Sequence, residues 1–244
     1  MRYAILADIH ANLAAFTAVL EAIKREGGVE ELWCLGDIVG YGPDPHECIE
    51  LLRQYKHVCV AGNHDWAAIG KIDTSDFNPA AAAAAHWTTG QLTPQDVDYL
   101  RDLPLTIEKD DFTLAHGSPR EPIWEYLLSV SSARENFVHF NTKFCLVGHS
   151  HVPLIFKQTE TSGCSFASFK AGDRLVLAEN RLIINPGGVG QPRDGDPRAS
   201  YAIYDSDNRV IQLYRIPYNI GVTQSRMMQH KLPLRLIVRL SYGM

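Results

Sequence analysis

The stretch Tyr3-Ala4-Ile5-Leu6-Ala7-Asp8-Ile9-His10 sets the pattern of this chain, because a short apolar run ends abruptly in a carboxylate and an imidazole. None of the runs of this kind alternates with polar residues, which is typical of strands buried on both faces of a mostly parallel sheet. We therefore expect an α/β fold with five such strands, at Tyr3–Ala7, Leu32–Leu35, Val58–Ala61, Phe112–Ala115 and Phe144–Val147.

Each apolar run is followed by a polar motif that carries the side chains divalent metal ions bind. The motifs are Asp8-x-His10, Gly36-Asp37, Gly62-Asn63-His64-Asp65, His116-Gly117 and Gly148-His149-Ser150-His151. One such motif alone is usually a turn or a strand end. In open α/β sheets the ligand site lies beyond the carboxyl ends of the strands, so the five motifs are expected to meet at one edge.

Two of the motifs hold a pair of candidate ligands separated by one residue. In an extended chain, such partners lie on the same face of the strand at a spacing of about 6.6 Å. A small rotation at the strand end would then direct Asp8 with His10, and His149 with His151, toward neighbouring ions.

With these motifs in place, the chain resembles the calcineurin-like metallophosphoesterases from Asp8 to about Asp205. The resemblance is strongest to their small bacterial phosphodiesterase or diadenosine-tetraphosphatase-like branch. Three further segments carry it: Gly36–Pro43, Ala115–Arg120 and Asn185–Arg193. The resemblance implies a two-sheet β-sandwich flanked by α-helices.

The resemblance also implies a binuclear metal centre in which Asp37 bridges the two ions. The first ion would be held by Asp8, His10, Asp37 and His151, and the second by Asp37, Asn63, His116 and His149. This nitrogen and oxygen donor set contains no thiolate, which suits Mn, Fe, Co, Ni or Zn rather than an all-oxygen site for Ca or Mg. Among these divalent or trivalent ions, we favour Mn or Fe.

The reaction expected from two such ions is hydrolysis of a phosphate ester. Metals about 3.5–4 Å apart can share a bridging hydroxide that attacks phosphorus, and can stabilise the attacking and leaving oxygens. His64 is the candidate general acid, with the neighbouring Asp65 as the carboxylate that orients its imidazole. The alternative is that Asn63-His64-Asp65 only caps the following helix.

The residues that would bind the substrate are less clearly marked. Arg120, Arg193 and Arg198 lie in loops near candidate ligands and could hold phosphate oxygens, because guanidinium matches their geometry. Surface ion pairs are an equally good explanation for any one of them. Four aromatic residues also follow the motifs and could stack on a nucleobase or close a small core: Tyr41, Trp66, Trp124 and Tyr126.

The expected substrates are small phosphodiesters, nucleotides or dinucleoside polyphosphates. Calcineurin-type protein phosphatases carry Asp-Arg-Gly after the Gly-Asp pair, where this chain has Val39-Gly40-Tyr41. A phosphoprotein phosphatase is therefore a weaker alternative than a phosphodiesterase, and a phosphomonoesterase also stays open. A further alternative is a non-catalytic scaffold of the same fold, although such proteins typically lose the acid histidine or a ligand.

Composition narrows the class of protein further. The net charge of −5 argues against a dedicated binder of long nucleic acid, while a small anionic ester remains compatible. No stretch approaches the roughly 18 apolar residues of a membrane span, and a signal peptide is not apparent, so we expect a cytoplasmic protein. Its oligomeric state is left open. Five cysteines without Cys-x-x-Cys spacing are expected to be reduced.

The 244 residues are expected to form a single metallophosphoesterase domain, with residues 219–244 as a C-terminal helical tail. Helices are expected at Asn12–Glu26, where apolar residues recur at helical spacing, and after the cap Asn78-Pro79. Tyr201–Tyr204 and Val210–Tyr214 are expected to pair as a hairpin that extends a second sheet.

Overall fold

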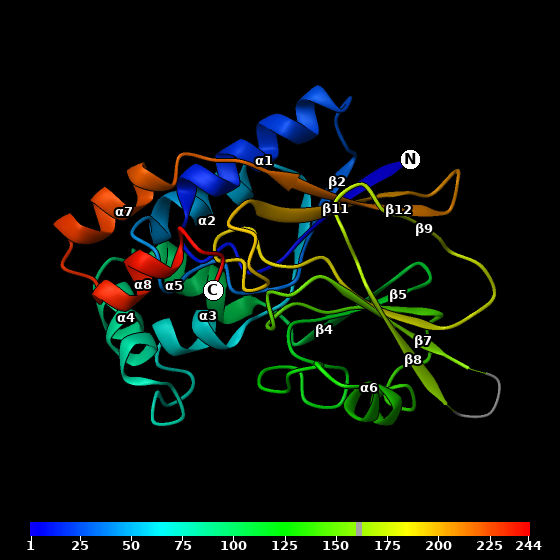
Figure 1. Cartoon of the computed structure of the whole chain (residues 1–244). Coiled ribbons are helices and arrows are strands. Elements are labelled where there is room, and N and C mark those ends of the chain that lie inside the picture. The colour runs from blue at the N-terminus through cyan, green and yellow to red at the C-terminus, as the bar shows by residue number, and fades with distance from the viewer. Residues whose placement is uncertain (160–162) are drawn as a thin grey trace.

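The apolar runs become strands of two mixed sheets that pack face to face between helices, as Figure 1 shows for this computed structural model. The structure describes residues 1–159 and 163–244. The first sheet has the order β3 (His57–Cys59), β2 (Glu31–Cys34), β1 (Arg2–Leu6), β11 (Ala199–Asp205), β12 (Val210–Ile216) and β9 (Arg174–Val176). The second has the order β4 (Thr106–Lys109), β5 (Phe112–Ala115), β6 (Phe144–Leu146), β10 (Leu182–Asn185), β7 (Leu154–Gln158) and β8 (Cys164–Ser168). The expected two-sheet sandwich is confirmed.

The five apolar runs do not share one sheet. β1, β2 and β3 are parallel neighbours in the first sheet, while β5 and β6 are parallel neighbours in the second. The expectation of a single mostly parallel sheet is wrong, because β4 pairs antiparallel with β5 and the chain starts a new sheet there. The motifs nevertheless meet, since the carboxyl ends of both parallel sets lie at the same end of the sandwich.

The strands are apolar on both faces because each sheet packs against the other sheet on one face and against helices on the opposite face. Tyr3 and Ile5 of β1 point between the sheets, where Tyr3 stacks on Trp33 with ring centroids 4.7 Å apart. Ala4 and Leu6 point the other way and pack against Phe16 on a helix. This double burial is why the runs show no polar alternation.

Helices cover the outer faces of both sheets. α1 (Leu13–Arg25) begins where the Asn12 side chain accepts a hydrogen bond from the Ala15 N–H at 3.2 Å. α6 (Val130–Asn136) covers the second sheet, and Figure 1 shows it on the side opposite α1. The remaining helices are α2 (Pro45–Arg53), α3 (Asn63–Ala68), α4 (Pro79–Thr89), α5 (Pro94–Asp102), α7 (Ile220–Gln229) and α8 (Leu234–Arg239).

The predicted hairpin forms from β11 and β12, but it joins the first sheet. β11 lies antiparallel beside β1, with Ile5 opposite Ala202. The expectation that it extends the second sheet is wrong, because the buried edge of β1 is free to pair with it.

The last residues form α7 and α8, which pack against the segment after β2 and against α4. Leu236, Ile237 and Leu240 share a buried cluster with Tyr41. Thr223 of α7 donates a hydrogen bond to the Asn12 side chain at 2.8 Å. No helix in the described part of the chain is long and apolar enough to cross a membrane.

Candidate metal centre

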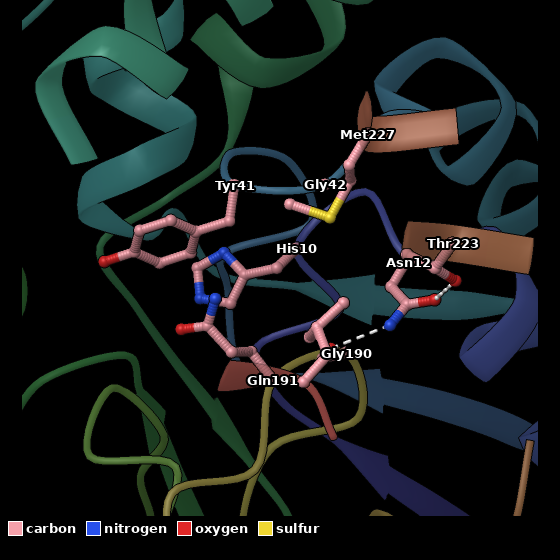
Figure 2. Close-up of a pocket in the computed structure, with 9 residues that line it drawn as sticks. His10, Asn12, Tyr41, Gly42, Gly190, Gln191, Thr223 and Met227 are labelled. Carbon is pink, nitrogen blue, oxygen red and sulfur yellow. Dashed lines mark hydrogen bonds between the residues drawn. The ribbon is translucent and has the colours of Figure 1, made fainter. Parts of the chain in front are cut away.

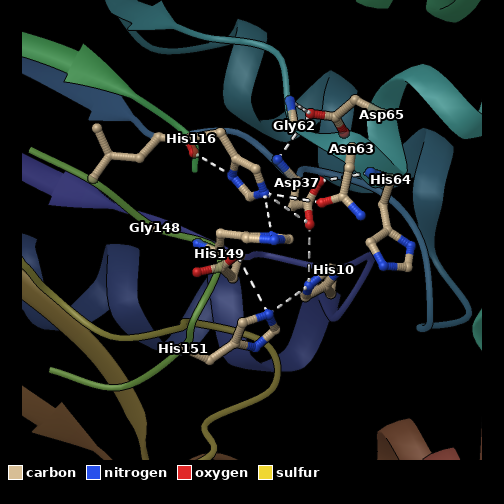
Figure 3. Close-up of polar contacts among 12 residues, drawn as sticks. His10, Asp37, Gly62, Asn63, His64, Asp65, His116, Gly148, His149 and His151 are labelled. Carbon is tan, nitrogen blue, oxygen red and sulfur yellow. Dashed lines mark hydrogen bonds and ion pairs between the residues drawn. The ribbon is translucent and has the colours of Figure 1, made fainter. Parts of the chain in front are cut away.

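The strand ends bring seven candidate ligands into one buried cluster. All of them except Asp8 are labelled in Figure 3. Within the described residues, the potential ligand atoms form two groups, and those of each group lie within 4.8 Å of one another. The groups are Asp8 with His10 and His151, and Asp37 with His116 and His149. The amide oxygen of Asn63 lies 3.1 Å from Nε2 of His116 and so adjoins the second group.

Asp37 lies between the two groups. Its Oδ2 is 3.6 Å from Nε2 of His10 in the first group and 3.3 Å from Nε2 of His116 in the second. Its Oδ1 accepts a hydrogen bond from the main-chain N–H of His64 at 2.8 Å. Oδ2 is buried and has no hydrogen-bond partner among the described residues, so it is free to face both groups.

The protonation of the four histidines follows from their main-chain partners. His10 and His116 place Nδ1 against the carbonyl oxygens of Val39 at 3.1 Å and Leu35 at 2.8 Å. His151 places Nδ1 2.5 Å from the Gln191 carbonyl oxygen, and His149 places Nε2 3.2 Å from that of Trp124. A carbonyl oxygen only accepts, so each of these nitrogens carries the proton. The other nitrogen keeps a lone pair for a metal.

Those lone-pair nitrogens face one another. Nε2 of His10 lies 3.2 Å from Nε2 of His151, and Nε2 of His116 lies 3.1 Å from Nδ1 of His149. Two bare acceptors at this distance repel, so each pair needs a proton or a cation beside it. Oδ2 of Asp8 is likewise buried without a hydrogen-bond partner in the described chain. The residues therefore fit two nitrogen- and oxygen-ligated cations.

The pKa shifts of the carboxyl and imidazole groups in the cluster also indicate that it binds cations. Burial and the neighbouring Asp37 carboxylate raise the pKa of Asp8 to about 7. Burial also disfavours the Asp37 carboxylate, but the positive charges of His116 and His64 hold its pKa below the usual range. His116 is opposed by burial, yet the Asp37 carboxylate raises its pKa to about 9. A divalent cation would replace the second proton that this raised pKa places on His116.

The remaining ligand histidines are held neutral. Burial lowers the pKa of His10, His149 and His151 well below the usual value. A neutral imidazole is the form that binds metals.

The main chain is strained at the ligands. Five of the seven candidate ligand residues have left-handed φ angles between 50° and 62°, a region that costs energy for residues with a side chain: Asp8, His10, Asp37, His149 and His151. The expected extended arrangement of Asp8-x-His10 and His149-x-His151 is therefore wrong. Left-handed turns place Asp8 and His10 in one group, and send His149 and His151 to different groups.

His64 lies at the edge of this cluster. Its ring packs on His10 and Tyr41, with centroids 5.0 and 4.2 Å away, and on Phe77 at 4.7 Å. Its Nδ1 is buried with no hydrogen-bond partner in the described chain. Gly40 is required beside it, because a Cβ there would lie 2.6 Å from Nδ1. Burial lowers the pKa of His64 to about 4.

The expected pairing of Asp65 with His64 is corrected by the structure. One Asp65 oxygen accepts hydrogen bonds from the N–H groups of Asp37 at 2.8 Å and Gly62 at 3.0 Å, and the other from Val39 at 3.1 Å. Figure 3 shows the Asp65 carboxylate directed at this main chain and away from the His64 ring. Asp65 therefore shapes the ligand-bearing loops and does not orient the imidazole.

The three candidate arginines have different surroundings. Arg120 is bound by the carboxylates of Glu125 and Glu135, and Arg198 by that of Asp196. Both are therefore neutralised locally, as the surface ion-pair alternative describes. Arg193 differs.

The main-chain N–H of Arg193 donates to the carbonyl of His151 at 3.3 Å. Its Nη2 donates to the Tyr41 hydroxyl at 3.3 Å and to Oε1 of Gln191 at 3.0 Å. Its charge also lowers the pKa of His10 and His64, after burial and other neighbours. Of the three, Arg193 is the one that the structure brings to the cluster.

Several contributors to the site were missed by reasoning from the sequence. The carbonyl groups that orient the histidines belong to residues of any type, so they leave no signal in a sequence. Asn185 holds the Gly148–His151 turn by donating to the Gly148 carbonyl at 2.6 Å and to the Ser150 hydroxyl at 3.0 Å. The sequence signal that could have pointed to Asn185 is its place in the segment Asn185–Arg193, which carries part of the family resemblance. Tyr126, by contrast, is one of the four aromatic residues that follow the motifs, and it stacks on His149 with centroids 3.8 Å apart.

Comparisons with known proteins agree with this geometry. A metallophosphoesterase of Sphaerobacter thermophilus has a crystal structure that superposes with a TM-score of 0.91 at 46% identity, covering 100% of this chain and 99% of that one. An uncharacterised protein of Methanocaldococcus jannaschii is 37% identical over 98% of this chain and 97% of its own length.

A more distant relative carries a specific name. The symmetrical bis(5′-nucleosyl)-tetraphosphatase of Haemophilus ducreyi is 28% identical over 54% of this chain, which spans 50% of that protein. Residues 1–209 of the chain match the calcineurin-like phosphoesterase superfamily domain. With two candidate metal-binding groups at the strand ends and this match over most of its length, the chain belongs to the calcineurin-like phosphoesterase superfamily and is a hydrolase of phosphate esters.

Proposed function

We propose that the protein is a binuclear metal-dependent phosphoesterase that hydrolyses small phosphodiesters, nucleotides or dinucleoside polyphosphates. The observation that carries the proposal is the pair of ligand groups that face a common atom, Oδ2 of Asp37. One ion is held by Asp8, His10, Asp37 and His151, and the other by Asp37, Asn63, His116 and His149. When bound, the two ions supply Lewis acidity toward the phosphate and an activated water for in-line displacement.

The protein residues around the ions supply orientation and protons. His64 donates a proton to the departing oxygen, which the packing of its ring against His10 of the first group supports. Because burial disfavours its charged form, the proton on His64 has to be stabilised by the substrate anion itself. Arg193 offers a guanidinium to a phosphate oxygen beside the His151 ligand loop.

Small substrates are supported by the relatives and by the surface charge. The tetraphosphatase relative is named for dinucleoside polyphosphates, although the match covers half of it. A net charge of −5 gives no general attraction for long nucleic acid. Gly40 packs under the His64 ring at a position within the segment where protein phosphatases carry Asp-Arg-Gly. A phosphoprotein phosphatase therefore stays the weaker alternative, and a scaffold would not need the complete donor set.

The proposal is tested with Asp37→Asn, which removes the charge that both groups share. We expect elemental analysis to show two ions per wild-type chain and at most one in the variant. Turnover of bis(4-nitrophenyl) phosphate should fall by more than the roughly 10- to 100-fold typical of residues that only support a ligand.

The control is Asp98→Asn, because Asp98 is an exposed carboxylate in α5 whose ion-pair partner among residues 1–159 and 163–244 is Arg101. It should keep both ions and full turnover. An Asp37→Asn protein with two ions and wild-type rates would refute the binuclear assignment, and a wild-type protein without ions or turnover would favour the scaffold.

A further inference from the structure

The first ligand group has little free space on its inner side. The cavity next to His10 measures about 10 Å³, which is room for about one water molecule. Figure 2 shows the side chains of Tyr41, Gln191 and Met227 around this cavity. A nucleobase does not fit there, so the organic part of a substrate has to lie on another side of the metal centre.

The second ligand group carries an exposed aromatic ring. Tyr126 stacks on the ring of the candidate ligand His149, with centroids 3.8 Å apart and planes inclined by 27°. Tyr126 is nevertheless 47% exposed. Since His149 covers one face of the Tyr126 ring, this exposure leaves the opposite face open to solvent. The open face lies beside the metal centre, because Nδ1 of His149 faces Nε2 of His116 at 3.1 Å.

Two further aromatic residues form a chain of contacts from His149 to the candidate acid His64. The carbonyl of Trp124 accepts the hydrogen bond from Nε2 of His149 at 3.2 Å. The ring of Phe77 meets that of Trp124 edge to face at 5.5 Å and packs on His64 at 4.7 Å. Phe77 and Trp124 are half-buried, whereas Tyr126 is exposed. Tyr126 is therefore the ring of this border that a substrate can reach most easily.

The loop that carries Tyr126 is fixed through the preceding residue, Glu125. The Glu125 carboxylate accepts hydrogen bonds from the Ser118 hydroxyl at 2.6 Å and from the Asn136 amide at 2.9 Å. It also forms an ion pair with Arg120. Ser118 lies two residues after a candidate ligand, so these bonds tie the loop to the metal centre. A ring held in this way loses little conformational freedom when a planar group stacks on it.

We propose that Tyr126 is the surface on which the nucleobase of the substrate stacks. This inference rests on the proposed function, because the attacked phosphate occupies the metal centre. Every base has a π face, so stacking on an aromatic side chain tolerates different bases. The substrate class is thereby narrowed to nucleotide esters, without a preference for one base.

The alternative is that Tyr126 only holds the ring of His149 in place. The two roles differ in which substrates they affect. Loss of a residue that positions a metal ligand slows the hydrolysis of every ester, whereas loss of a stacking surface affects only esters that carry a base.

The test compares two diesters that differ only in the base. Adenosine 5′-(methyl phosphate) carries adenine, and its base-free analogue has hydrogen at C1′ instead. Tyr126→Leu keeps an apolar side chain on His149 and removes the aromatic ring. It should lower kcat/KM for the adenosine ester about 5- to 150-fold, mainly through KM. The value for the base-free ester should change about twofold at most, as for a surface substitution.

Tyr126→Phe keeps the ring and should retain the wild-type ratio of the two kcat/KM values. Tyr55→Leu is the matched control, because Tyr55 is 39% exposed and precedes β3, at the end of the sheet away from the metal centre. It should leave both esters unaffected. Elemental analysis should give the same metal content for all variants.

Equal losses on the two esters for Tyr126→Leu, or the loss of an ion, would assign Tyr126 to the positioning of His149 and overturn the stacking role. An adenosine ester that is hydrolysed by Tyr126→Leu as fast as by the wild type would overturn it as well.

Calorimetry in the presence of Mn²⁺ provides a readout that does not depend on turnover. The probe is the methylenephosphonate analogue of adenosine monophosphate, which has a P–C bond in place of the ester. It should bind the wild type more tightly than its base-free counterpart, and Tyr126→Leu should remove most of this difference. If the wild type hydrolyses neither diester, the proposed function fails while this measurement still decides the stacking role. Identical affinities of the wild type and Tyr126→Leu for the probe would refute it.

Discussion

Each candidate ligand histidine has one ring nitrogen hydrogen-bonded to a main-chain oxygen, and this hydrogen bond leaves the other nitrogen to bind a metal. The carbonyls of Leu35 and Val39 lie in the loop after β2, so the backbone that carries Asp37 also orients His116 and His10. A change in that loop therefore affects both ligand groups together. Nδ1 of His64 has no such partner in the part of the chain that the structure describes, which distinguishes it from the ligands and leaves it available for proton transfer.

The role of His64 is tested by His64→Asn with two leaving groups. Both ions should stay bound, because all seven candidate ligands remain. General acid catalysis is worth about 100- to 10,000-fold, and an alkoxide needs the proton while a nitrophenolate does not. We expect a large loss on nucleotide esters and a small one on nitrophenyl esters. Equal losses, or a missing ion, would assign His64 to positioning or ligation.

Asp65→Asn should behave differently from His64→Asn. The amide of the variant would turn an N–H donor toward main-chain N–H groups that now donate to the carboxylate. Each buried donor left unsatisfied costs about 1–3 kcal/mol. The free energy of unfolding in urea should fall by that order, and turnover of both ester types should fall by the same factor. A loss confined to esters with alkoxide leaving groups would show instead that Asp65 assists His64 as general acid.

The candidate ligands could be recognised from the sequence because chemistry restricts them to a few residue types placed directly after buried strands. Asp65 shows where that reasoning stops. A carboxylate beside a histidine has the same sequence whether it faces the imidazole or the main chain, and only the loop geometry decides.

Contacts between elements are also sensitive to pH. His46 of α2 hydrogen-bonds Asp96 of α5 at 2.9 Å, so that one imidazole joins two helices. This hydrogen bond raises the pKa of His46 above its usual value of 6.5. A raised folded-state pKa stabilises the fold fully below the unfolded value, and this contribution is lost as the pH rises through the folded value.

The difference in thermal midpoint between the wild type and His46→Gln should therefore be larger at pH 6 than at pH 9. The change should be small, because the His46 side chain is 44% exposed to solvent. A difference that stays constant or grows with pH would show that protonation of His46 does not connect the helices.

At the scale of the molecule, each ligand group draws on both sheets. Asp8 and His10 follow β1 of the first sheet, while His151 follows β6 of the second. The same division holds for Asp37 against His116 and His149. This arrangement could not be read from the sequence, since apolar runs do not reveal which sheet they join. Bound ions would therefore connect the two halves of the sandwich.

Removal of the ions with EDTA should lower the thermal midpoint. A ligand at 100 times its Kd stabilises the folded state by about 2.7 kcal/mol per site. For a chain of this size, that corresponds to roughly 5–10 °C for each ion. Calorimetric scans with and without Mn²⁺ measure the shift. Coincident midpoints with ions shown to be bound would mean that they do not hold the sheets together.

The left-handed turns at the five ligand residues set a conflict between durability and activity. Glycine would relieve the backbone strain at any of these positions, yet it would delete the ligand. A laboratory selection for heat resistance that ignores turnover would therefore have no reason to keep these residues and could erase the enzyme. Selection that rewards turnover has to keep the strained residues and find its stabilising substitutions elsewhere.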